Sequence, residues 1–174
     1  MIQKNTRTIH KRANTGHVAD LLQSIFLAEL LNPSEELWIM SPWISDIPII
    51  DNRGNQFTHL HPAWEGSRVK LSAVVFQLLL KGAAVYLVTR PEEHNVTFLG
   101  NLNNLLGNKG YPLHIREVQE FHEKGILGGD YYLSGSMNLT YYGITLNEEV
   151  LHYFTDSEII AEKKLFVRDR WGVE

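Results

Sequence analysis

Four polar residues between positions 122 and 138 have the types and spacing of a phosphate site. His122 and Lys124 are two residues apart, and Ser136 and Asn138 repeat that spacing. Residues two apart on a strand point to the same face of a sheet, so each pair would share a face. A Gly-Gly-Asp turn ending at Asp130 separates the pairs and predicts a hairpin. A hairpin centred on Asp130 would place Lys124 opposite Ser136 and His122 opposite Asn138.

This patch has the chemistry of an oxyanion site. An imidazole that titrates near neutral pH, an ammonium, a hydroxyl and an amide can together surround a phosphate. Because Gly135 has no Cβ, the backbone there could approach such a group closely. The same spacing also fits a hairpin whose polar residues have no such role, and spacing alone leaves both interpretations open.

The elements that must position these residues follow from the apolar pattern. Helices alternate with short strands before the polar segment, which predicts an α/β domain with parallel strands and crossover helices. After residue 121 the pattern changes to strands and turns without a helix until a last helix, and function is expected in this break, at residues 121–149. The expected helices are 17–31, 70–80, 98–106 and 157–170; the strands are 37–40, 84–88 and 113–118; and 51–68 is a long loop.

The composition is that of one soluble domain, with 174 residues, 44% of them apolar and 21% charged. The chain has no cysteine, which excludes thiolate zinc sites, disulfides and thiol catalysis and suits a reducing, cytoplasmic location. The longest apolar stretch, 73–80, is too short to span a bilayer, so no membrane association is expected. Trp38, Phe76 and Phe166 lie on apolar faces and are predicted to be core residues.

The net charge of −4 is unevenly distributed. The first basic residues precede any acidic one, so we divide the chain into a basic arm, 1–16, and a single domain, 17–174. The arm is either a frayed terminus or a local contact for a polyanion, because the acidic remainder repels one. A transit peptide is a further interpretation, whereas a secretory signal is excluded because no apolar stretch follows the basic residues. These basic residues are Lys4, Arg7, Lys11 and Arg12.

The polar segment resembles the phospholipase D superfamily, whose members carry H-x-K, an aspartate and then G-S-x-N. His122-Glu-Lys124 and Gly135-Ser136-Met-Asn138 match this pattern. The similarity extends to 37–46 (LWIMSPWISD, a first strand and its Pro-Trp turn), 71–91 (the next helix and strand) and 143–150 (GITLNEEV). The resemblance implies a phospholipase D-like α/β domain with a mixed, mostly parallel sheet flanked by helices on both faces.

One position departs from the family pattern. The family's aspartate falls five positions after the lysine, where this chain has Gly129, and Asp130 follows in a hairpin that is one residue shorter. In the family this aspartate is mainly structural. Asp130 either fills that role from a shifted turn or the role is absent.

The resemblance also implies a reaction. A covalent route to phosphodiester hydrolysis needs a nucleophile on one side of phosphorus and an acid on the other, and one imidazole cannot serve both. The chain has one H-x-K motif, so a second subunit should supply the other copy, as in single-motif bacterial nucleases of the family. In this homodimer one His122 would form a phosphohistidine while the partner's His122 protonates the leaving oxygen. Their opposite protonation states predict a bell-shaped pH profile.

The family pattern implies further roles for individual residues. Lys124 and Asn138 are expected to hold the nonbridging oxygens, with Ser136 as a further donor. Glu149 is expected to orient the imidazole, although it could also be a surface carboxylate beside Glu148. Because these groups replace the cation that many phosphodiesterases recruit, no metal or other cofactor is expected, and activity should persist in a chelator.

Other residues could contribute to binding. Trp43 and His59 are expected at a substrate groove, Trp43 at the rim of the pocket, where aromatic rings can stack on bases. His59 and His61 have the spacing of a metal pair, but no third ligand is near in sequence, which favours a loop or substrate-facing role. Trp64 fits the groove or simple loop packing. Candidate phosphate contacts, which could equally be solvated charges, are Arg53, Arg68, Lys70 and Arg90.

Two functional hypotheses follow. The first is a homodimeric, metal-independent phosphodiesterase that acts on nucleic acid, with DNA favoured over RNA but the two not distinguished by the sequence. A nuclease is favoured because short single-motif members of the family are nucleases, whereas its lipid-acting members carry two motifs. The second is a noncatalytic or partner-dependent nucleic-acid-binding subunit of a DNA modification or restriction assembly in a defence cluster, with its other subunits as partners. The acidic body favours the second, because a free-standing nuclease should have a more basic surface.

Overall fold

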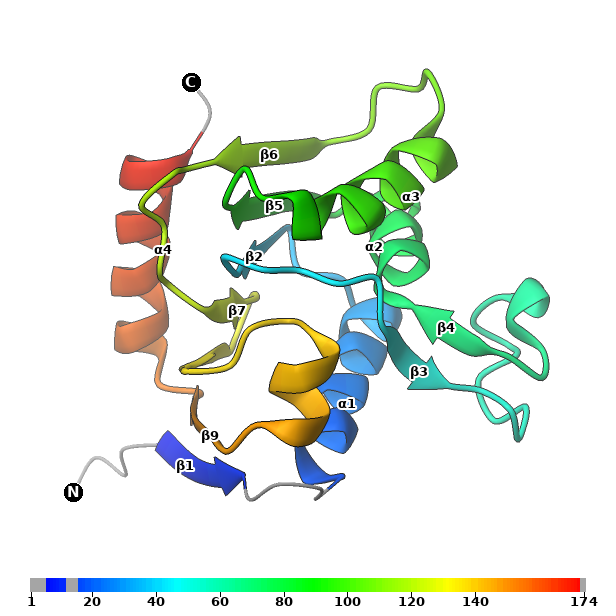
Figure 1. The fold of residues 1–174 in the computed structure, drawn as a ribbon, viewed down its shortest axis with the longest axis horizontal. Coiled ribbons are helices and arrows are strands. Elements are labelled where there is room, and N and C mark those ends of the chain that lie inside the picture. Colours follow the sequence, from blue (N-terminus) through cyan, green and yellow to red (C-terminus); the bar gives the residue numbers. More distant parts are fainter. Residues whose placement is uncertain (1–5, 12–15, 173–174) are drawn as a thin grey trace.

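A mixed β-sheet forms the centre of the molecule (Figure 1). The computed structural model describes residues 6–11 and 16–172. Among these residues, seven strands pair in the order β1-β9-β8-β7-β2-β5-β6. Their bounds are β1 Thr6–Lys11, β2 Glu36–Met40, β5 Ala84–Thr89, β6 Leu113–Glu117, β7 Gly125–Leu127, β8 Tyr132–Gly135 and β9 Glu149–Phe154.

Strand direction divides the sheet into two parts. β2, β5 and β6 are parallel neighbours joined through helices, as predicted. β7 is antiparallel to β2, and the sheet continues antiparallel through β8 and β9 to β1. The mixed α/β class is therefore confirmed: five of these seven strands run in one direction, and β7 and β9 run against them. Strands joined by a tight turn, as β7 and β8 are, pair antiparallel, whereas parallel neighbours need a long crossover.

Helices cover both faces of the sheet (Figure 1). α1 (His17–Leu31), α2 (Leu71–Leu80) and α3 (Val96–Leu106) lie on one face, and α4 (Ser157–Trp171) lies on the other. All agree with the predicted ranges to within about two residues. In α1 the buried positions Val18, Leu22 and Ile25 recur at the helical period, which explains why the pattern was readable in the sequence.

Each face of the sheet has its own hydrophobic cluster. The larger one lies between the sheet and α1–α3, and the smaller one lies under α4, where Ile160 and Val167 pack on the sheet. Trp38 is buried as predicted, and Phe76 is partly buried against the larger cluster. The prediction for Phe166 is wrong: it is 44% exposed on α4. Because Phe166 precedes Val167 by one position, it points to a different side of the helix.

Part of the basic arm belongs to the sheet. Thr6–Lys11 form β1, which pairs with β9 along its whole length, from Thr6 opposite Phe154 to Lys11 opposite Glu149. This part of the arm is therefore an edge strand and not a frayed terminus. Lys4 and Arg12 lie outside the described residues.

The register of the β7–β8 hairpin differs by one residue from the prediction. Gly125 lies opposite Ser134 and Leu127 opposite Tyr132, and the Gly128 amide donates to the Tyr131 carbonyl. The hairpin is therefore centred between Gly129 and Asp130, not on Asp130. A one-residue slip exchanges the two faces of a strand, so the predicted cross-strand pairs of polar residues do not form.

A helical turn interrupts the segment that was predicted to contain only strands and turns. Tyr142–Leu146 form a π-helical turn, η3, between β8 and β9. Gly143 allows its close packing, because a Cβ at this position would lie 2.3 Å from the carbonyl oxygen of Asn138. A single turn is too short to show a helical period in the sequence.

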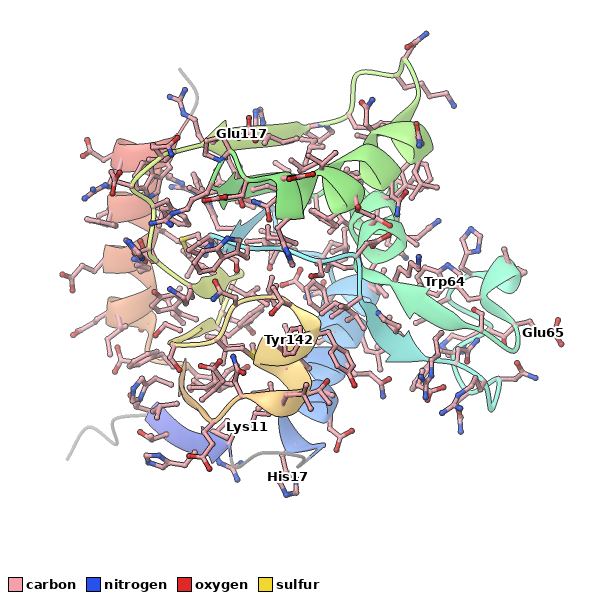
Figure 2. The ribbon with its side chains drawn as sticks, in the orientation of Figure 1. Lys11, His17, Trp64, Glu65, Glu117 and Tyr142 are labelled. Atoms are coloured by element: carbon pink, nitrogen blue, oxygen red, sulfur yellow. The ribbon has the colours of Figure 1, made fainter. Side chains whose placement is uncertain are left out.

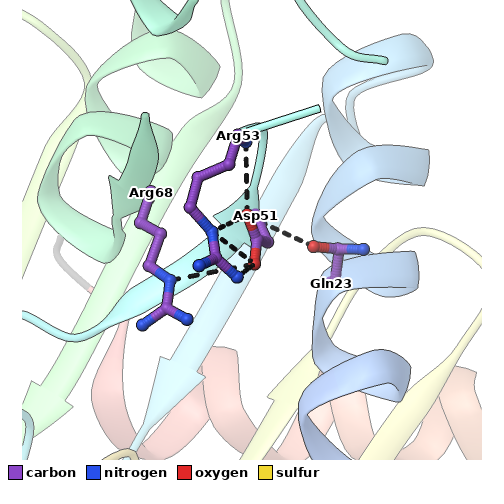
Figure 3. A network of polar contacts seen from close by, with 4 residues as sticks. All are labelled: Gln23, Asp51, Arg53 and Arg68. Carbon is purple, nitrogen blue, oxygen red and sulfur yellow. Dashed lines mark hydrogen bonds and ion pairs between the residues drawn. The ribbon is translucent and has the colours of Figure 1, made fainter. Parts of the chain in front are cut away.

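The predicted long loop is framed by a small hairpin, β3 (Pro48–Asp51) and β4 (Arg68–Lys70), with one helical turn, η1 (Pro62–Trp64), between them. It projects from the side of the molecule that carries α1 and α2 (Figure 1). At its base the Asp51 carboxylate accepts hydrogen bonds from Arg53 at 2.6–3.2 Å and faces Arg68 at 3.7 Å (Figure 3). The Asp51 amide donates to Gln23 on α1, which ties the hairpin to the domain.

None of the helices in the described part of the chain has the length and apolar character needed to cross a membrane.

Candidate active site

The candidate residues gather at one end of the sheet because of the strand directions. β2, β5 and β8 run the same way, and β7 and β9 run against them. The residues that follow β2, β5 and β8 therefore meet those that begin or precede β7 and β9. This end, which we call the site end, brings together Trp43, Arg90, His122, Lys124, Gly135, Ser136, Asn138 and Glu149.

Arg90 is the residue that contacts the His122 imidazole. Its Nη2 lies 2.7 Å from His122 Nε2, and its Nε donates to the Phe121 carbonyl at 2.7 Å. The guanidinium carbon is 5.5 Å from the centre of the Trp43 ring, within the range of a cation–π contact. His122 itself is exposed. Of the candidate phosphate contacts in the sequence, Arg90 is thus placed beside the H-x-K motif.

Lys124 is half-buried and contacts the backbone of His122. Its Nζ donates to the His122 carbonyl at 2.7 Å. Burial lowers the pKa of the Lys124 ammonium, the Arg90 guanidinium lowers it further, and the Glu149 carboxylate acts in the opposite direction. The site end therefore holds two neighbouring cations close enough to repel each other, an arrangement that an added anion would stabilise.

Ser136 and Glu149 form a second contact pair at the site end. Ser136 Oγ donates to the Glu149 carboxylate and accepts from the Val150 amide at 3.1 Å. Asn147 Nδ2 donates to the other carboxylate oxygen at 3.4 Å. Glu149 is only 8% exposed, so it is not the surface carboxylate considered in the sequence analysis. Its carboxylate is engaged with Ser136, and its role toward an imidazole stays a prediction.

Asn138 and Gly135 hold the loop after β8 in place. Asn138 Oδ1 accepts from Ser41 Oγ at 3.4 Å, and Ser41 Oγ also accepts from the Leu139 amide at 3.1 Å. Gly135 has φ +153°, and a Cβ there would lie 2.1 Å from the Val150 carbonyl oxygen. The close approach that requires glycine is thus to the neighbouring strand β9.

The structure does not bring Asp130 or His59 to this end. Asp130 lies in the turn after β7, at the opposite end of the sheet from His122. His59 lies in the β3–β4 connection, far from β7 in the view of Figure 1. In that connection His61 accepts from the Ala63 amide and stacks on Trp64, which is buried. Trp64 therefore fits loop packing.

Lys11 is a site-end residue that the sequence analysis assigned only to the basic arm. It is 3% exposed, ends β1 opposite Glu149, and donates from Nζ to the Gly143 carbonyl at 2.9 Å. Figure 2 shows it beside the turn that carries Tyr142. Burial lowers the pKa of Lys11, and Glu149 partly offsets this effect. The only signal of its strand in the sequence is the short segment Thr-Arg-Thr-Ile-His-Lys.

Among the described residues, no group of three or more His, Asp or Glu side chains is arranged to hold a metal ion.

The sheet order, the helices on both faces and the site end define the class: the chain has a phospholipase D-like fold. The phospholipase D family member Nuc from Salmonella typhimurium superposes with a TM-score of 0.62 at 13% identity, covering 97% of this chain and 95% of Nuc. NucT from Helicobacter pylori gives 0.59 at 13% identity, covering 94% and 93%.

A third structure with this fold is TrmBL2, described as an archaeal chromatin protein with a novel mode of DNA binding. It superposes with a TM-score of 0.55 at 11% identity and covers 98% of this chain and 54% of TrmBL2. No protein-family model and no curated protein sequence matches the chain. At these identities the similarity establishes the fold.

Proposed function

We propose that the protein is a metal-independent phosphodiesterase that cleaves nucleic acid through a covalent phosphohistidine. The observation that carries this proposal is the exposed His122 imidazole, set beside Arg90 and Lys124 at the end of a phospholipase D-like sheet. An imidazole at the surface, with one cation on its ring and a second on its own backbone carbonyl, matches the needs of phosphoryl transfer, in which negative charge spreads over the nonbridging oxygens.

The reaction takes two displacements at phosphorus. In the first, the lone pair of His122 Nε2 forms a bond to phosphorus as the ester P–O bond breaks, and the leaving oxygen takes a proton from the partner's His122. In the second, the partner's imidazole removes a proton from water, whose oxygen attacks phosphorus and breaks the P–N bond. Lys124 binds the nonbridging oxygens, and Asn138 and Ser136 are available as further donors.

The second imidazole belongs to a second copy of the chain. One protomer presents one His122 at its site end, so the composite site needs two copies. Exposed apolar residues cluster in sequence around η3 and the start of β9, which also carries Glu149, and such patches mark interaction surfaces. We call this set the apolar patch: Tyr141 (55% exposed), Tyr142 (64%), Leu146 (38%) and Val150 (37%).

Nucleic acid is the proposed substrate because of Trp43. Its ring lies under the Arg90 guanidinium at the site end, where a base could stack next to the bound phosphate. DNA binding without cleavage is a second candidate, favoured by the similarity to the chromatin protein TrmBL2. In that case the same cations would bind DNA phosphates without cleaving the DNA. The protein would then act as a DNA-binding subunit of a modification or restriction assembly.

Cleavage assays in a chelator test the catalytic proposal. Wild-type protein should cleave labelled single-stranded or duplex DNA in EDTA and form an acid-labile phosphoprotein. His122→Ala should do neither, whereas His114→Gln, which changes a histidine on the far edge strand β6, should behave as the wild type. Cleavage by His122→Ala, or a strict need for added magnesium, would overturn the proposal. DNA binding without cleavage would support the second candidate.

Mixing the wild-type protein with His122→Ala tests the composite site. If each site needs two His122 residues, a mixed dimer with His122→Ala is inactive. After exchange of subunits, activity per wild-type chain should fall in proportion to the wild-type fraction. Activity that is independent of added His122→Ala would show that one chain is sufficient.

A further inference from the structure

The Arg90 guanidinium contacts His122 Nε2, the atom that the proposed reaction uses as the nucleophile. A guanidinium has only donor hydrogens, so its 2.7 Å contact requires His122 Nε2 to accept with a lone pair. An imidazolium carries hydrogens on both nitrogens and could not accept there. In this contact the ring proton lies on Nδ1, and the guanidinium covers the Nε2 lone pair that would attack phosphorus.

The backbone of Arg90 is held in place by a buried amide side chain. Its backbone carbonyl accepts from Asn95 Nδ2 at 2.8 Å, and Asn95 is 1% exposed. The same amide group donates to the Pro42 carbonyl at 3.0 Å and to Thr89 Oγ1 at 2.8 Å, which fixes the segment after β5. The guanidinium lies at the end of the side chain, where it contacts the Phe121 carbonyl, the imidazole and the Trp43 ring.

A phosphate oxygen is a better partner for this guanidinium than the imidazole is. A phosphate carries the opposite charge, which a neutral imidazole lacks, and it can accept two guanidinium N–H groups at once in a bidentate pair. Lys124 is close enough for Arg90 to lower its pKa, so an anion brought between the two cations is attracted by both. Transfer of Arg90 to this anion relieves their repulsion and uncovers Nε2.

We propose that Arg90 is a phosphate-displaced clamp on His122: it covers Nε2 in the free protein and moves to a nonbridging oxygen when a phosphodiester binds. The inference rests on the proposed function for its catalytic consequence. Its displacement by phosphate can be measured without any turnover. Arg90 is in this sense a positioning residue, which acts on the nucleophile through the state of His122.

Imidazole ¹⁵N signals of histidine-labelled protein, recorded with increasing inorganic phosphate, test the clamp directly. In the wild type His122 should be the Nδ1–H tautomer with a hydrogen-bonded Nε2, and phosphate should shift the Nε2 signal. In Arg90→Gln the tautomers should mix and phosphate should no longer change that signal. Arg116→Gln removes an exposed arginine from the neighbouring strand β6 and should behave as the wild type.

Kinetics with bis(p-nitrophenyl) phosphate test the catalytic consequence. Loss of a charged hydrogen bond to the substrate should lower kcat/KM of Arg90→Gln about 10- to 100-fold, mainly through KM. Arg90→Lys should recover part of this loss, because it restores the charge without the fork geometry. Arg116→Gln should retain the wild-type value.

Two outcomes would overturn the clamp. One is a His122 ¹⁵N signal that responds to phosphate in Arg90→Gln as it does in Arg116→Gln. The other is a wild-type protein in which His122 is the Nε2–H tautomer. A phosphate-dependent shift in a wild type that hydrolyses no diester would leave the clamp standing and overturn the catalytic proposal. Diester hydrolysis that Arg90→Gln leaves unchanged, in both the kinetics and the ¹⁵N response, would overturn the clamp and leave the catalytic proposal standing.

Discussion

The carboxylate of Glu149 is buried, accepts from Ser136 and faces the buried cation of Lys11. Removing its charge while keeping its shape, as in Glu149→Gln, weakens a charge-assisted hydrogen bond and leaves Lys11 without its neighbouring anion. We expect Glu149→Gln to lower the free energy of unfolding by about 1.5–3 kcal/mol. Denaturant unfolding measures this loss.

The neighbouring residue supplies the matched control. Glu148 is exposed, so Glu148→Gln should change the unfolding free energy by less than about 0.5 kcal/mol. Equal effects of the two substitutions would contradict the assigned role of Glu149.

Spacing in the sequence identified several site residues but not their partners. His122 and Lys124 were recognisable because a short motif carries their chemistry, and the structure places both at the site end. The contact between Arg90 and His122 joins residues 32 positions apart, and it depends on β5 and β7 lying on either side of β2. No local pattern encodes such a contact, so Arg90 could not be separated from the other surface arginines.

The helices and strands also differ in how well the sequence predicts them. The helices were predictable because their buried residues recur at the helical period over several turns. β1 was not, since only Ile9 and Lys11 of its six residues turn away from solvent. The hairpin register could not be fixed because a turn centred on Asp130 and one centred before it differ by half a residue, and both satisfy the Gly-Gly-Asp signal.

The edge strand β1 stabilises the site end through Lys11. Lys11→Met keeps the length of the side chain but leaves the buried Gly143 carbonyl without its donor. An unsatisfied buried acceptor costs about 1–3 kcal/mol, so we expect a loss of stability of that size. Hydrogen exchange should also become faster at β9 amides that pair with β1, such as Leu151.

Lys109→Met, at an exposed position, provides the control for that experiment. Unchanged exchange at β9 in Lys11→Met, together with wild-type stability, would show that Lys11 does not anchor the strand.

The β3–β4 hairpin carries an acid titration that can be assigned to one contact. The Arg53 hydrogen bonds lower the pKa of Asp51 to about 2, and Arg68 contributes least. A lowered carboxyl pKa gives stability that is complete above the unfolded pKa and is lost as pH falls through the folded one. Between about pH 3.8 and 2 the hairpin should therefore loosen.

Carboxyl ¹³C shifts of Asp51 over this range measure its pKa. Arg53→Ala should raise that pKa toward 3.8, and Arg68→Ala should raise it less. The opposite order would contradict the contact shown in Figure 3, in which Arg53 holds the carboxylate.

At the scale of the whole molecule, the distribution of charge reconciles an acidic chain with an anionic ligand. The net charge is −4, but Lys11, Arg90 and Lys124 all lie at the site end. A local cluster acts within about one Debye length, roughly 8–10 Å at moderate salt, whereas the repulsion from the remaining surface is largely screened. The acidic composition therefore does not prevent a polyanion from binding at this end.

Tyrosines on both sides of the sheet give the molecule a defined alkaline limit. Burial raises the pKa of Tyr86, Tyr131, Tyr132 and Tyr153, and nearby carboxylates raise it further. A raised pKa means that the unfolded chain loses its phenolic protons first. The stability from these groups is therefore complete below the ordinary phenolic pKa of 10.0 and is lost as pH rises through the folded values. The protein should unfold cooperatively above about pH 10, with a simultaneous rise in tyrosinate absorbance.

Tyr132→Phe tests this limit because it removes one of the titrating groups while keeping the ring that packs under α4. The variant loses the hydrogen bond to Glu123, so it should be less stable than the wild type at neutral pH by about 1 kcal/mol. Its stability should nevertheless fall less steeply above about pH 10, since one fewer proton is released on unfolding. Tyr111→Phe, in the turn before β6, should retain the wild-type slope. A slope in Tyr132→Phe as steep as in the wild type would mean that Tyr132 ionises equally in the folded and unfolded chain, which its burial beside Glu123 does not allow.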